Sequence, residues 1–410
     1  MYLSSARSAD HSRPAGRAAR RVSSTVVTLG VVSLLTDISS EMVSSVLPLY
    51  YTSVLGLTML QTGFLDGLFN GATVFLRLVG AHLADRFQAR KYVALAGYGL
   101  SALCKLALPA AGASLPALSA ALAADRSGKG LRTAPRDALI SLSSTPETQG
   151  RAFGVHRMMD TAGAFCGPLA AFALLSAVAV AYDAVFVASF CVATLGLLVL
   201  LLFVRDQRGT HTRAKPVLRT ALDLLRDRTF RRTCLLVTLL ETATISDAFV
   251  YLTLQRQDDL AARWFPLLAL GTAAPYLLLS LPAGTLADRF GPWRLYLGGH
   301  LCFLALLALL AVGGSGPLVL TVALLLHGTF YAATDAPLMA HAARLLPAEA
   351  RTSGFAVLQS LQALGMFASS LLFGTAYRLV GARTTLELFA VGLLLSLGLA
   401  TALIRKGTTA

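Results

Sequence analysis

The sequence has 410 residues, of which 55% are hydrophobic and 14% are charged, and its mean hydropathy is +0.66. A soluble domain carries about 25% charged residues, so this composition excludes an ordinary soluble enzyme and indicates a protein that crosses a membrane many times. One crossing takes roughly 20 apolar residues, so the chain has room for about twelve. The net charge of +14 is explained by membrane topology, and we expect no nucleic-acid partner.

Apolar runs divide the chain into membrane spans. Residues 1–23 form an arginine-rich tail that we expect to be cytoplasmic, followed by an uncleaved first span. A basic stretch at 205–232 separates an N-terminal half at 24–204 from a C-terminal half at 233–404, and 405–410 form a short cytoplasmic tail. The predicted fold is all-α, with twelve transmembrane helices at 24–54, 61–86, 91–112, 115–137, 152–180, 183–204, 233–256, 264–288, 293–313, 317–343, 352–380 and 384–404.

Lysine and arginine residues predict how these spans are oriented. With the N-terminus placed in the cytoplasm, the inner segments hold 26 of these residues and the outer segments hold four. Basic residues concentrate in cytoplasmic loops, where they also meet anionic lipid. We therefore expect a protein of the bacterial inner membrane with both termini in the cytoplasm.

A short repeat relates the two halves. Residues 83–87 read Leu-Ala-Asp-Arg-Phe, and the same five residues recur at 286–290, after the second span of each half. An identity at half the chain length, in matching positions, predicts two pseudo-symmetric six-helix halves. Transporters built in this way place the substrate near the membrane midplane between the halves.

The repeat resembles the loop signature G-x-L-a-D-R-x-G of the major facilitator superfamily. Residues 284–291 fit it, whereas the first copy has Ala81 and Gln88 where glycines are expected. The resemblance implies that the loop Asp and Arg residues gate the movement of the two halves. In this sequence they are Asp85, Arg86, Asp288 and Arg289.

The fifth span carries a second signature. Gly154, Gly163, Gly167 and Pro168 match G-x8-G-x3-G-P, which in the superfamily is associated with antiporters. The two glycines that close the motif are replaced here by Ala171 and Phe172. Glycines on one helix face permit close helix contact, and proline permits a bend. General packing of small residues is the alternative interpretation.

Residues 125–137 hold six charges in a largely apolar chain. Residues 126–130 resemble the superfamily's fourth-span motif R-x-x-Q-G, with Lys129 at the glutamine, and the resemblance implies a role for Arg126 in proton coupling. A phosphate-binding loop is excluded, because no glycine stands five residues before Gly128 and no Ser or Thr follows Lys129. Asp125 belongs with Arg126 and Lys129 in the membrane. We assign 132–137 to the cytoplasmic end, where anchoring explains the charges.

A buried charge network is predicted around this span. Asp37 and Glu41 share a helix face in the first span, and His156 and Asp160 share one in the fifth. Charges persist within a membrane when they are paired or reach water, and a buried carboxyl group can carry a proton. The network joins the carboxylates Asp37, Glu41, Asp125 and Asp160 to the cations Arg126, Lys129 and Arg157. Glu41 and Asp37 are the first choices for the proton carrier, and a static ion-pair cluster is the alternative.

Other polar residues within spans could line a substrate pocket. They are Asp66, Asn70, Glu241, Asp247, Tyr331 and Asp335. Purely structural roles are the alternative for each. Because the first half concentrates the charges, we place coupling there and part of the pocket in the second half. The patterns in spans one, four and five together resemble a prokaryotic subgroup of the superfamily whose members mostly lack assigned substrates.

These patterns predict a secondary transporter rather than an enzyme. The expected activity is proton-coupled export of a small organic solute by a rocking movement of the halves, working as a monomer in the lipid bilayer. A proton-linked uptake symporter is the alternative, and a transport-fold sensor is a more distant one. The histidines are scattered and no H-E-x-x-H motif occurs, so we expect no metal and no cofactor.

Overall fold

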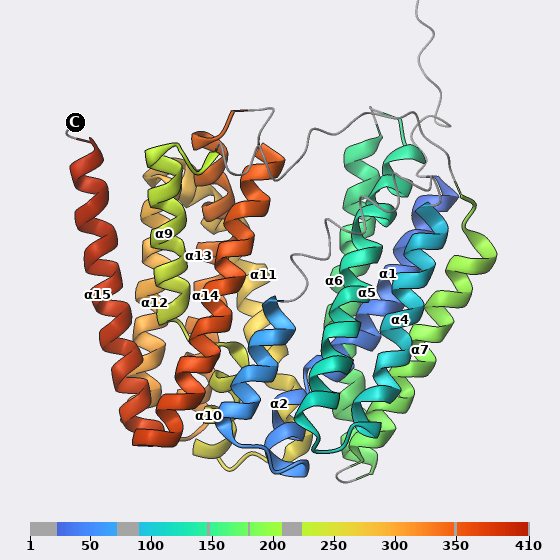
Figure 1. Cartoon of the computed structure of the whole chain (residues 1–410), viewed down its shortest axis with the longest axis horizontal. Helices are drawn as coiled ribbons and strands as arrows, with labels where there is room; N and C mark the ends of the chain where they lie inside the picture. Colours follow the sequence, from blue (N-terminus) through green and yellow to red (C-terminus); the bar gives the residue numbers. More distant parts are fainter. Residues whose placement is uncertain are drawn as a thin grey trace, which may run out of the picture.

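The computed structural model describes residues 23–71, 90–145, 148–178, 181–206, 224–347 and 351–408. Nearly all of them are helical (Figure 1). In the N-terminal half the helices are α1 (Ser24–Ser44), α2 (Leu47–Leu49), η2 (Tyr50–Val54), a helix at 59–71, α4 (Arg90–Ala110), α5 (Leu115–Leu142), α6 (Gln149–Ala177) and α7 (Tyr182–Phe203). In the C-terminal half they are α9 (Arg228–Ala243), α10 (Asp247–Gln257), η3 (Ala262–Trp264), α11 (Phe265–Phe290), α12 (Pro292–Val312), α13 (Pro317–Leu345), α14 (Arg351–Val380) and α15 (Ala382–Thr408).

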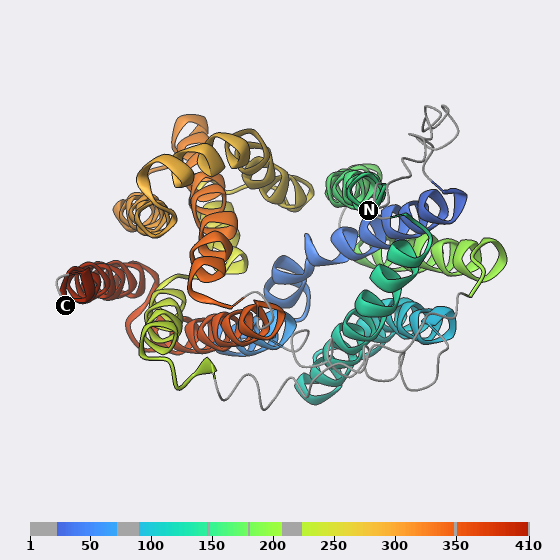
Figure 2. The ribbon, with the colours of Figure 1, turned by 90° about the horizontal axis from the view of Figure 1, so that it is seen from above.

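The helices form two groups that repeat one packing plan (Figure 2). In the first group α1 packs against α6 and α7, and α4 packs against α5 and α7. In the second group α9 packs against α14 and α15, and α12 packs against α13 and α15. The predicted all-α fold of two pseudo-symmetric halves is therefore confirmed.

The helices have the length and composition of membrane spans. Within the part of the chain that the structure describes, ten helices are long and apolar enough to cross a bilayer. The helix α5 is 28 residues long, but its charges keep it out of that set. The helix at 59–71 is described over only part of the predicted second span. The chain is a multi-pass membrane protein.

The first helix of each half is broken near its middle. The helix α1 ends at Ser44 and α2 begins at Leu47, where Pro48 has no N–H to continue the hydrogen-bond ladder. In the second half α9 ends at Ala243 and α10 begins at Asp247. Broken helices at membrane depth are tolerated where they line a cavity, so both breaks point to the interior between the halves.

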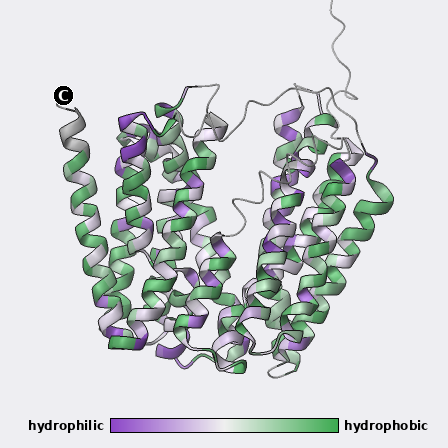
Figure 3. Ribbon diagram, in the orientation of Figure 1, coloured by the Kyte–Doolittle hydropathy of each residue, from purple (hydrophilic) through white to green (hydrophobic). Residues whose placement is uncertain are grey.

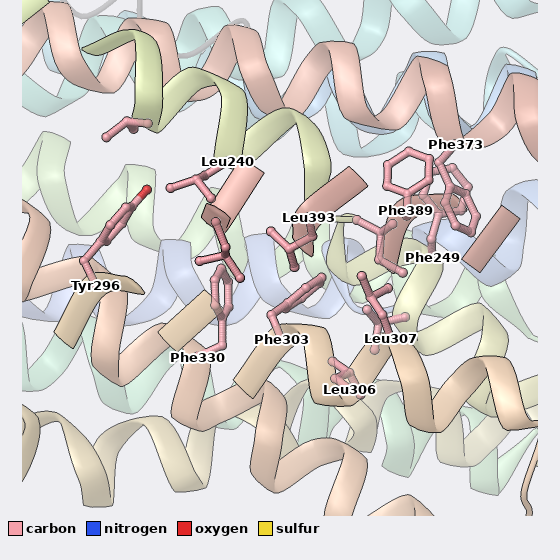
Figure 4. Packing of buried hydrophobic residues seen from close by; sticks show 14 of the residues in the cluster. Leu240, Phe249, Tyr296, Phe303, Leu306, Leu307, Phe330, Phe373, Phe389 and Leu393 are labelled. Atoms are coloured by element: carbon pink, nitrogen blue, oxygen red, sulfur yellow. The ribbon is translucent and has the colours of Figure 1, made fainter. Parts of the chain in front are cut away.

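The hydrophobic core differs between the halves. In the C-terminal half one continuous cluster joins α9 to α15, with Phe303, Phe330 and Phe373 among its buried rings (Figure 4). Among the described residues of the N-terminal half, which leave out 72–89, the buried apolar side chains form two clusters, one around Tyr50 and Phe186 and another around Leu29 and Tyr98. Polar residues of α1, α5 and α6 occupy the layer between these two clusters.

The two groups converge away from the chain termini (Figure 1). We call the end where α1 begins and α15 finishes the terminal end, and the other end the opposite end. Near the opposite end Phe172 packs against Trp264, with ring centroids 5.1 Å apart. A Cβ atom added at Gly67 would lie 2.7 Å from the ring of Phe367 in α14. The halves are therefore in close contact at the opposite end.

Candidate functional site

A cavity of about 570 Å³ lies between the two halves. Both helix breaks reach it, because Ser44 and Ser45 line it from one half and Asp247 and Ala248 line it from the other. Its volume falls within the range of about 300–1,000 Å³ that is usual for small-molecule sites. Its chemically distinctive lining residues are Glu41, Asp66, Asn70, Arg126, Lys129, Pro168, Asp247, Tyr251, Phe265, Tyr276, Tyr331 and Asp335.

Both cations among the described residues of this cavity lie on the wall of the N-terminal half, which also holds Glu41 and Asp66, whereas the charged residues of the C-terminal wall are carboxylates. Arg126 and Lys129 of α5 project from the N-terminal half, and Figure 3 shows hydrophilic residues along α5 and α6. The C-terminal wall holds Asp247 and Asp335 together with three tyrosines. Glu41 lines the cavity beside the cationic wall, where Ser44 Oγ donates a 2.8 Å hydrogen bond to its Oε2. The ammonium group of Lys129 is attracted by Glu41 and Asp37.

Asp125 does not face the cavity. It is 2% exposed and lies between α4 and α5, where it accepts hydrogen bonds from Ser101 Oγ at 2.5 Å and from Lys105 Nζ at 3.1 Å. Its other oxygen accepts from Arg126 Nε at 3.0 Å and also from Arg126 Nη2. One carboxylate thus satisfies two buried cations and orients Arg126, whose guanidinium lies 3.8 Å from the Phe69 ring centre.

Two glycines allow this arrangement. A Cβ atom at Gly97 of α4 would lie 2.7 Å from the Gly128 carbonyl oxygen of α5, and a Cβ atom at Gly128 would lie 3.0 Å from the Ser101 backbone nitrogen. Small residues at a helix contact permit such close backbone approach. Gly128 therefore brings α5 close enough to α4 for Asp125 to reach Ser101 and Lys105.

A second polar cluster joins α1, α5 and α6 on the terminal side of the cavity. The carboxyl groups of Asp37 and Asp160 lie close enough to interact. Arg136 Nη1 lies 4.0 Å from Asp160 Oδ1 and donates to Ser33 Oγ at 3.1 Å. The cluster therefore brings a carboxyl group of α1 and a carboxyl group of α6 beside one arginine of α5.

The other residues of the fifth span surround this cluster. His156 Nε2 is 2.9 Å from Ser33 Oγ. Arg157 Nη1 is 3.5 Å from Asp160 Oδ2, and the Arg157 side chain, which is 81% exposed, lies outside the cavity lining. Of the three cations predicted to complete the network, Arg126 and Lys129 line the cavity and Arg157 lies at the periphery.

The glycines of the fifth-span motif hold α6 against α1 at the two carboxylates. A Cβ atom at Gly163 would lie 3.0 Å from Asp37 Cβ, and one at Gly167 would lie 2.6 Å from Glu41 Cβ. Pro168 lines the cavity. A Cβ atom at Gly154 would meet no other atom within 4 Å. In this motif Gly163 and Gly167 allow close packing, Pro168 lines the cavity, and Gly154 is under no steric constraint.

In the C-terminal half Asp247 is held by a tyrosine and a histidine. Tyr331 Oη donates to Asp247 Oδ1 at 2.6 Å, and His327 Nε2 lies 3.1 Å from the same oxygen. His327 is fully buried, and its Nδ1 is 3.3 Å from Thr272 Oγ1. Tyr276 lies near the carboxyl group of Asp335. Aromatic side chains therefore lie beside both carboxylates of this wall.

Glu241 is placed differently from the other pocket residues predicted from the sequence. It lies outside the cavity lining, is 8% exposed, and accepts a 3.0 Å hydrogen bond from Gln362 Nε2. A Cβ atom at Gly365 of α14 would lie 2.9 Å from Glu241 Cβ, which parallels the contact of Gly167 with Glu41. Glu241 therefore occupies the position equivalent to Glu41 but points into the protein.

Asp66 and Asn70 lie in the cavity wall at the contact between the halves. Ser370 Oγ of α14 donates to Asp66 Oδ2 at 2.8 Å, and Asn70 Nδ2 donates to the Asp66 carbonyl oxygen at 3.1 Å. Asp66 therefore links the two halves directly.

The residues predicted to control gating are described in part. Asp85 and Arg86 lie outside the described residues. In the second copy Asp288 Oδ1 is 4.0 Å from Arg344 Nη2 of α13, and both side chains are more than half exposed. The guanidinium of Arg289 lies 5.2 Å from the Phe290 ring centre.

Several residues of the site were not assigned a role from the sequence. Lys105 is a lone charge in an apolar run. The presence of Asp125 in the next span is the sequence feature that could have identified its partner. Arg136 had been assigned to the cytoplasmic end, yet it contacts Ser33 and Asp160. Tyr251 and Tyr276 carry no distinguishing sequence signal, because aromatic residues are common in membrane helices.

Comparison with known sequences gives a family match along the chain. The family described as Major Facilitator Superfamily matches residues 29–274 and 248–409. An uncharacterized MFS-type transporter of Methanocaldococcus jannaschii is 41% identical over 150 residues, which are 36% of each chain. An uncharacterized protein of Mycobacterium tuberculosis is 36% identical over 157 residues, which are 38% of each chain. The matched segments thus span little more than a third of these curated relatives.

Solved structures of low sequence identity share the fold. The nucleoside transporter NupG superposes with a TM-score of 0.79 at 13% identity, covering 93% of this chain and 99% of that one. A POT family transporter in complex with 5-aminolevulinic acid gives 0.74 at 13% identity, covering 92% and 96%. A bacterial homolog of the human lysosomal transporter Spinster gives 0.66 at 16% identity, covering 92% and 93%. Because the family model matches most of the chain, this chain belongs to the Major Facilitator Superfamily.

Proposed function

We propose that this protein is a proton-coupled secondary transporter that exports a small zwitterionic organic solute from a bacterial cell. The observation that carries the proposal is the cavity between the halves, with a cationic wall on α5 and an anionic, aromatic wall on the other half. A solute with separated charges can satisfy both walls at once, whereas a singly charged solute leaves one wall unpaired, which is costly in a desolvated site.

The anionic group of the solute is assigned to Arg126 and Lys129, and its cationic group to Asp247 and Asp335. Arg126 is oriented by Asp125 and can present a fork of N–H donors to a carboxylate or phosphate. The rings of Tyr251 and Tyr276 favour a nearby cation through their negative faces. The cavity can therefore bind the anionic and the cationic group of a solute, and the proposal includes no metal or cofactor.

The proton is assigned to the carboxyl groups of α1 and α6. Asp37 and Asp160 lie close together and can share one proton, and Glu41 lies at the cavity surface near Lys129. An ionised Glu41 adds a negative charge to the cavity that attracts the cationic group of the solute, and a proton on Glu41 removes that charge. Proton and solute therefore compete for one carboxylate, as exchange across the membrane requires.

The direction of transport is assigned from the packing of α6 and from the basic segments. Gly163 and Gly167 place the antiporter-type motif directly on Asp37 and Glu41, which supports exchange of solute against protons. With the terminal end in the cytoplasm, the contact of the halves at the opposite end corresponds to a molecule closed toward the outside. The protein then acts as a monomer by alternating access, rocking its halves about the central cavity.

Purified protein in liposomes tests the proposal. A thermal-shift panel that compares zwitterions with their singly charged analogues first identifies a ligand, and the labelled ligand then enters a ΔpH assay. An antiporter accumulates the ligand when the lumen is acidic, whatever the orientation of each molecule. The variants Glu41→Gln and Asp37→Asn should lower this ΔpH-driven accumulation by about tenfold or more, while Glu387→Gln on the surface of α15 leaves it unchanged.

Each outcome of this assay has a distinct meaning. Accumulation driven by an acidic exterior would identify an uptake symporter and overturn the direction. Normal coupling in both carboxylate variants would remove Glu41 and Asp37 as proton carriers. A panel in which singly charged analogues shift the melting temperature as strongly as zwitterions would contradict the assignment of the two walls.

A further inference from the structure

A second cavity, of about 380 Å³, lies at the opposite end of the C-terminal half, between α10, α12, α14 and α15. Its deeper lining is apolar and includes Phe249, Leu252, Phe373 and Leu386. Its polar side is formed where α10 ends and α15 begins, with Arg256, Gln257, Tyr377 and Arg383. The cavity therefore combines a hydrophobic interior with a basic edge at the level where a membrane meets water.

The arginines at this edge are unusual for their position. The segments at the opposite end contain four basic residues, Arg256, Arg263, Arg378 and Arg383, and two of them line this single cavity. Arg256 Nη1 donates to Tyr377 Oη at 2.6 Å, which fixes the guanidinium at the cavity edge. Arg383 Nε bonds Glu387 Oε1 at 3.0 Å, and its side chain is 77% exposed. A guanidinium has five N–H donors, so both arginines have further donors for an anion.

We propose that this cavity binds a phospholipid with an anionic headgroup. The phosphate is held by Arg256 and Arg383, because guanidinium groups bind phosphate oxygens through paired, charge-assisted hydrogen bonds. An acyl chain packs on the apolar lining. Gln257 does not enter the apolar part, because its Nε2 donates a 2.7 Å hydrogen bond to the Leu310 carbonyl oxygen. The location at the helix ends matches the depth of a lipid headgroup.

The cavity wall includes one residue from the other half. Met59, at the start of the 59–71 helix, lines it together with the residues of α10 and α14. A Cβ atom at Gly374 of α14 would lie 2.6 Å from the Met59 carbonyl oxygen, so the two halves are in tight contact there. A lipid in this cavity therefore contacts both halves, and it favours the arrangement in which the opposite end is closed.

Native mass spectrometry of delipidated protein tests the site. Phosphatidylglycerol is titrated against the natural protein, the double variant Arg256→Gln/Arg383→Gln, and the control Arg378→Gln, an exposed arginine outside the cavity. The natural protein and the control should retain one tightly bound phosphatidylglycerol. The double variant should bind it about 10–100-fold more weakly, because two charge-assisted contacts are lost. Phosphatidylcholine should bind weakly to all three proteins.

Spin labels at Ala113 and Ser315, exposed loop positions at the opposite end of the two halves, report the effect on conformation. In nanodiscs, phosphatidylglycerol should increase the population with the short label distance for the natural protein and for Arg378→Gln, but not for the double variant. Equal retention of phosphatidylglycerol by the double variant would overturn the site. Binding of inorganic phosphate as tight as that of the lipid would also overturn the proposal, since the site would then take a soluble anion.

Discussion

The two halves share one packing plan but use polar residues in different ways. In the described part of the N-terminal half a layer of charged residues divides the hydrophobic core into two clusters. In the C-terminal half the core is continuous, and polar groups are held at its surface by aromatic and histidine side chains. Both halves present charge to the cavity, but Asp125 and Lys105 form a buried ion pair inside the first half, whereas Asp247 of the second half is held at the cavity surface.

Two carboxylates illustrate the difference. The side chain of Asp125 is 2% exposed and is surrounded by Lys105, Arg126 and Ser101. The side chain of Asp247 is 46% exposed, next to a fully buried His327. A charge that has lost its partner in a desolvated position is far more costly than one that reaches water. The comparison therefore predicts unequal effects of equivalent mutations in the two halves.

The largest effect is expected from Asp125→Asn. The substitution leaves Lys105 and Arg126 buried without a counter-charge, and removal of one partner of a buried pair costs about 3–5 kcal/mol. Thermal unfolding in detergent should show the loss as a lowered melting temperature. Adding Lys105→Met should restore part of the stability, because it removes one of the unpaired charges. A loss below about 1 kcal/mol in the single variant, the range of solvent-exposed pairs, would contradict the role of Asp125.

An intermediate effect is expected at the glycines that face the two equivalent glutamates. Gly167→Ala places a methyl group against Glu41, and Gly365→Ala places one against Glu241, so each should cost about 1–3 kcal/mol of stability. Only Gly167→Ala should also impair ΔpH-driven transport, because Glu41 lines the cavity and Glu241 does not.

Gly154→Ala is the control for these variants. Its added methyl group meets no neighbouring atom, and alanine favours a helix over glycine by about 0.5–1 kcal/mol. It should therefore leave transport unchanged and keep or slightly raise the melting temperature. Equal transport loss in Gly167→Ala and Gly365→Ala would indicate that the two halves do not divide their roles in this way.

Most of the fold could be predicted from the sequence because most membrane spans are continuous apolar runs. The repeat at 83–87 and 286–290 identified the two halves. The breaks inside the first helix of each half were not predicted. Residues 244–246 contain no proline or glycine, and such a break is stable because it lies against other helices and a cavity rather than because of its own composition.

The site could be predicted as a set of residues but not as a set of pairs. The charges of α1, α5 and α6 stand out in an apolar chain. Which of them meet depends on the rotation of α5 about its axis, and that rotation is set by the contact of Gly97 with Gly128. The same contact turns Asp125 toward Lys105 and leaves Lys129 on the cavity side. Helix periodicity predicts which side chains share a face of one helix, but the packing of the helices decides which neighbour each face contacts.

The smallest effect is expected from His327→Phe in the C-terminal half. The phenyl ring fits among the rings of Tyr251, Phe303 and Tyr331, while Asp247 keeps its bond from Tyr331 and its access to the cavity. The cost should be about 1 kcal/mol, the net value of the one hydrogen bond to Thr272 Oγ1 that is lost, and Tyr331→Phe is the matched variant that removes the hydrogen bond to Asp247. If His327→Phe instead lowered stability as much as Asp125→Asn, Asp247 would have to be an internal charge like Asp125. The contrast between the buried ion pair of the first half and the carboxylate at the cavity surface of the second would then no longer hold.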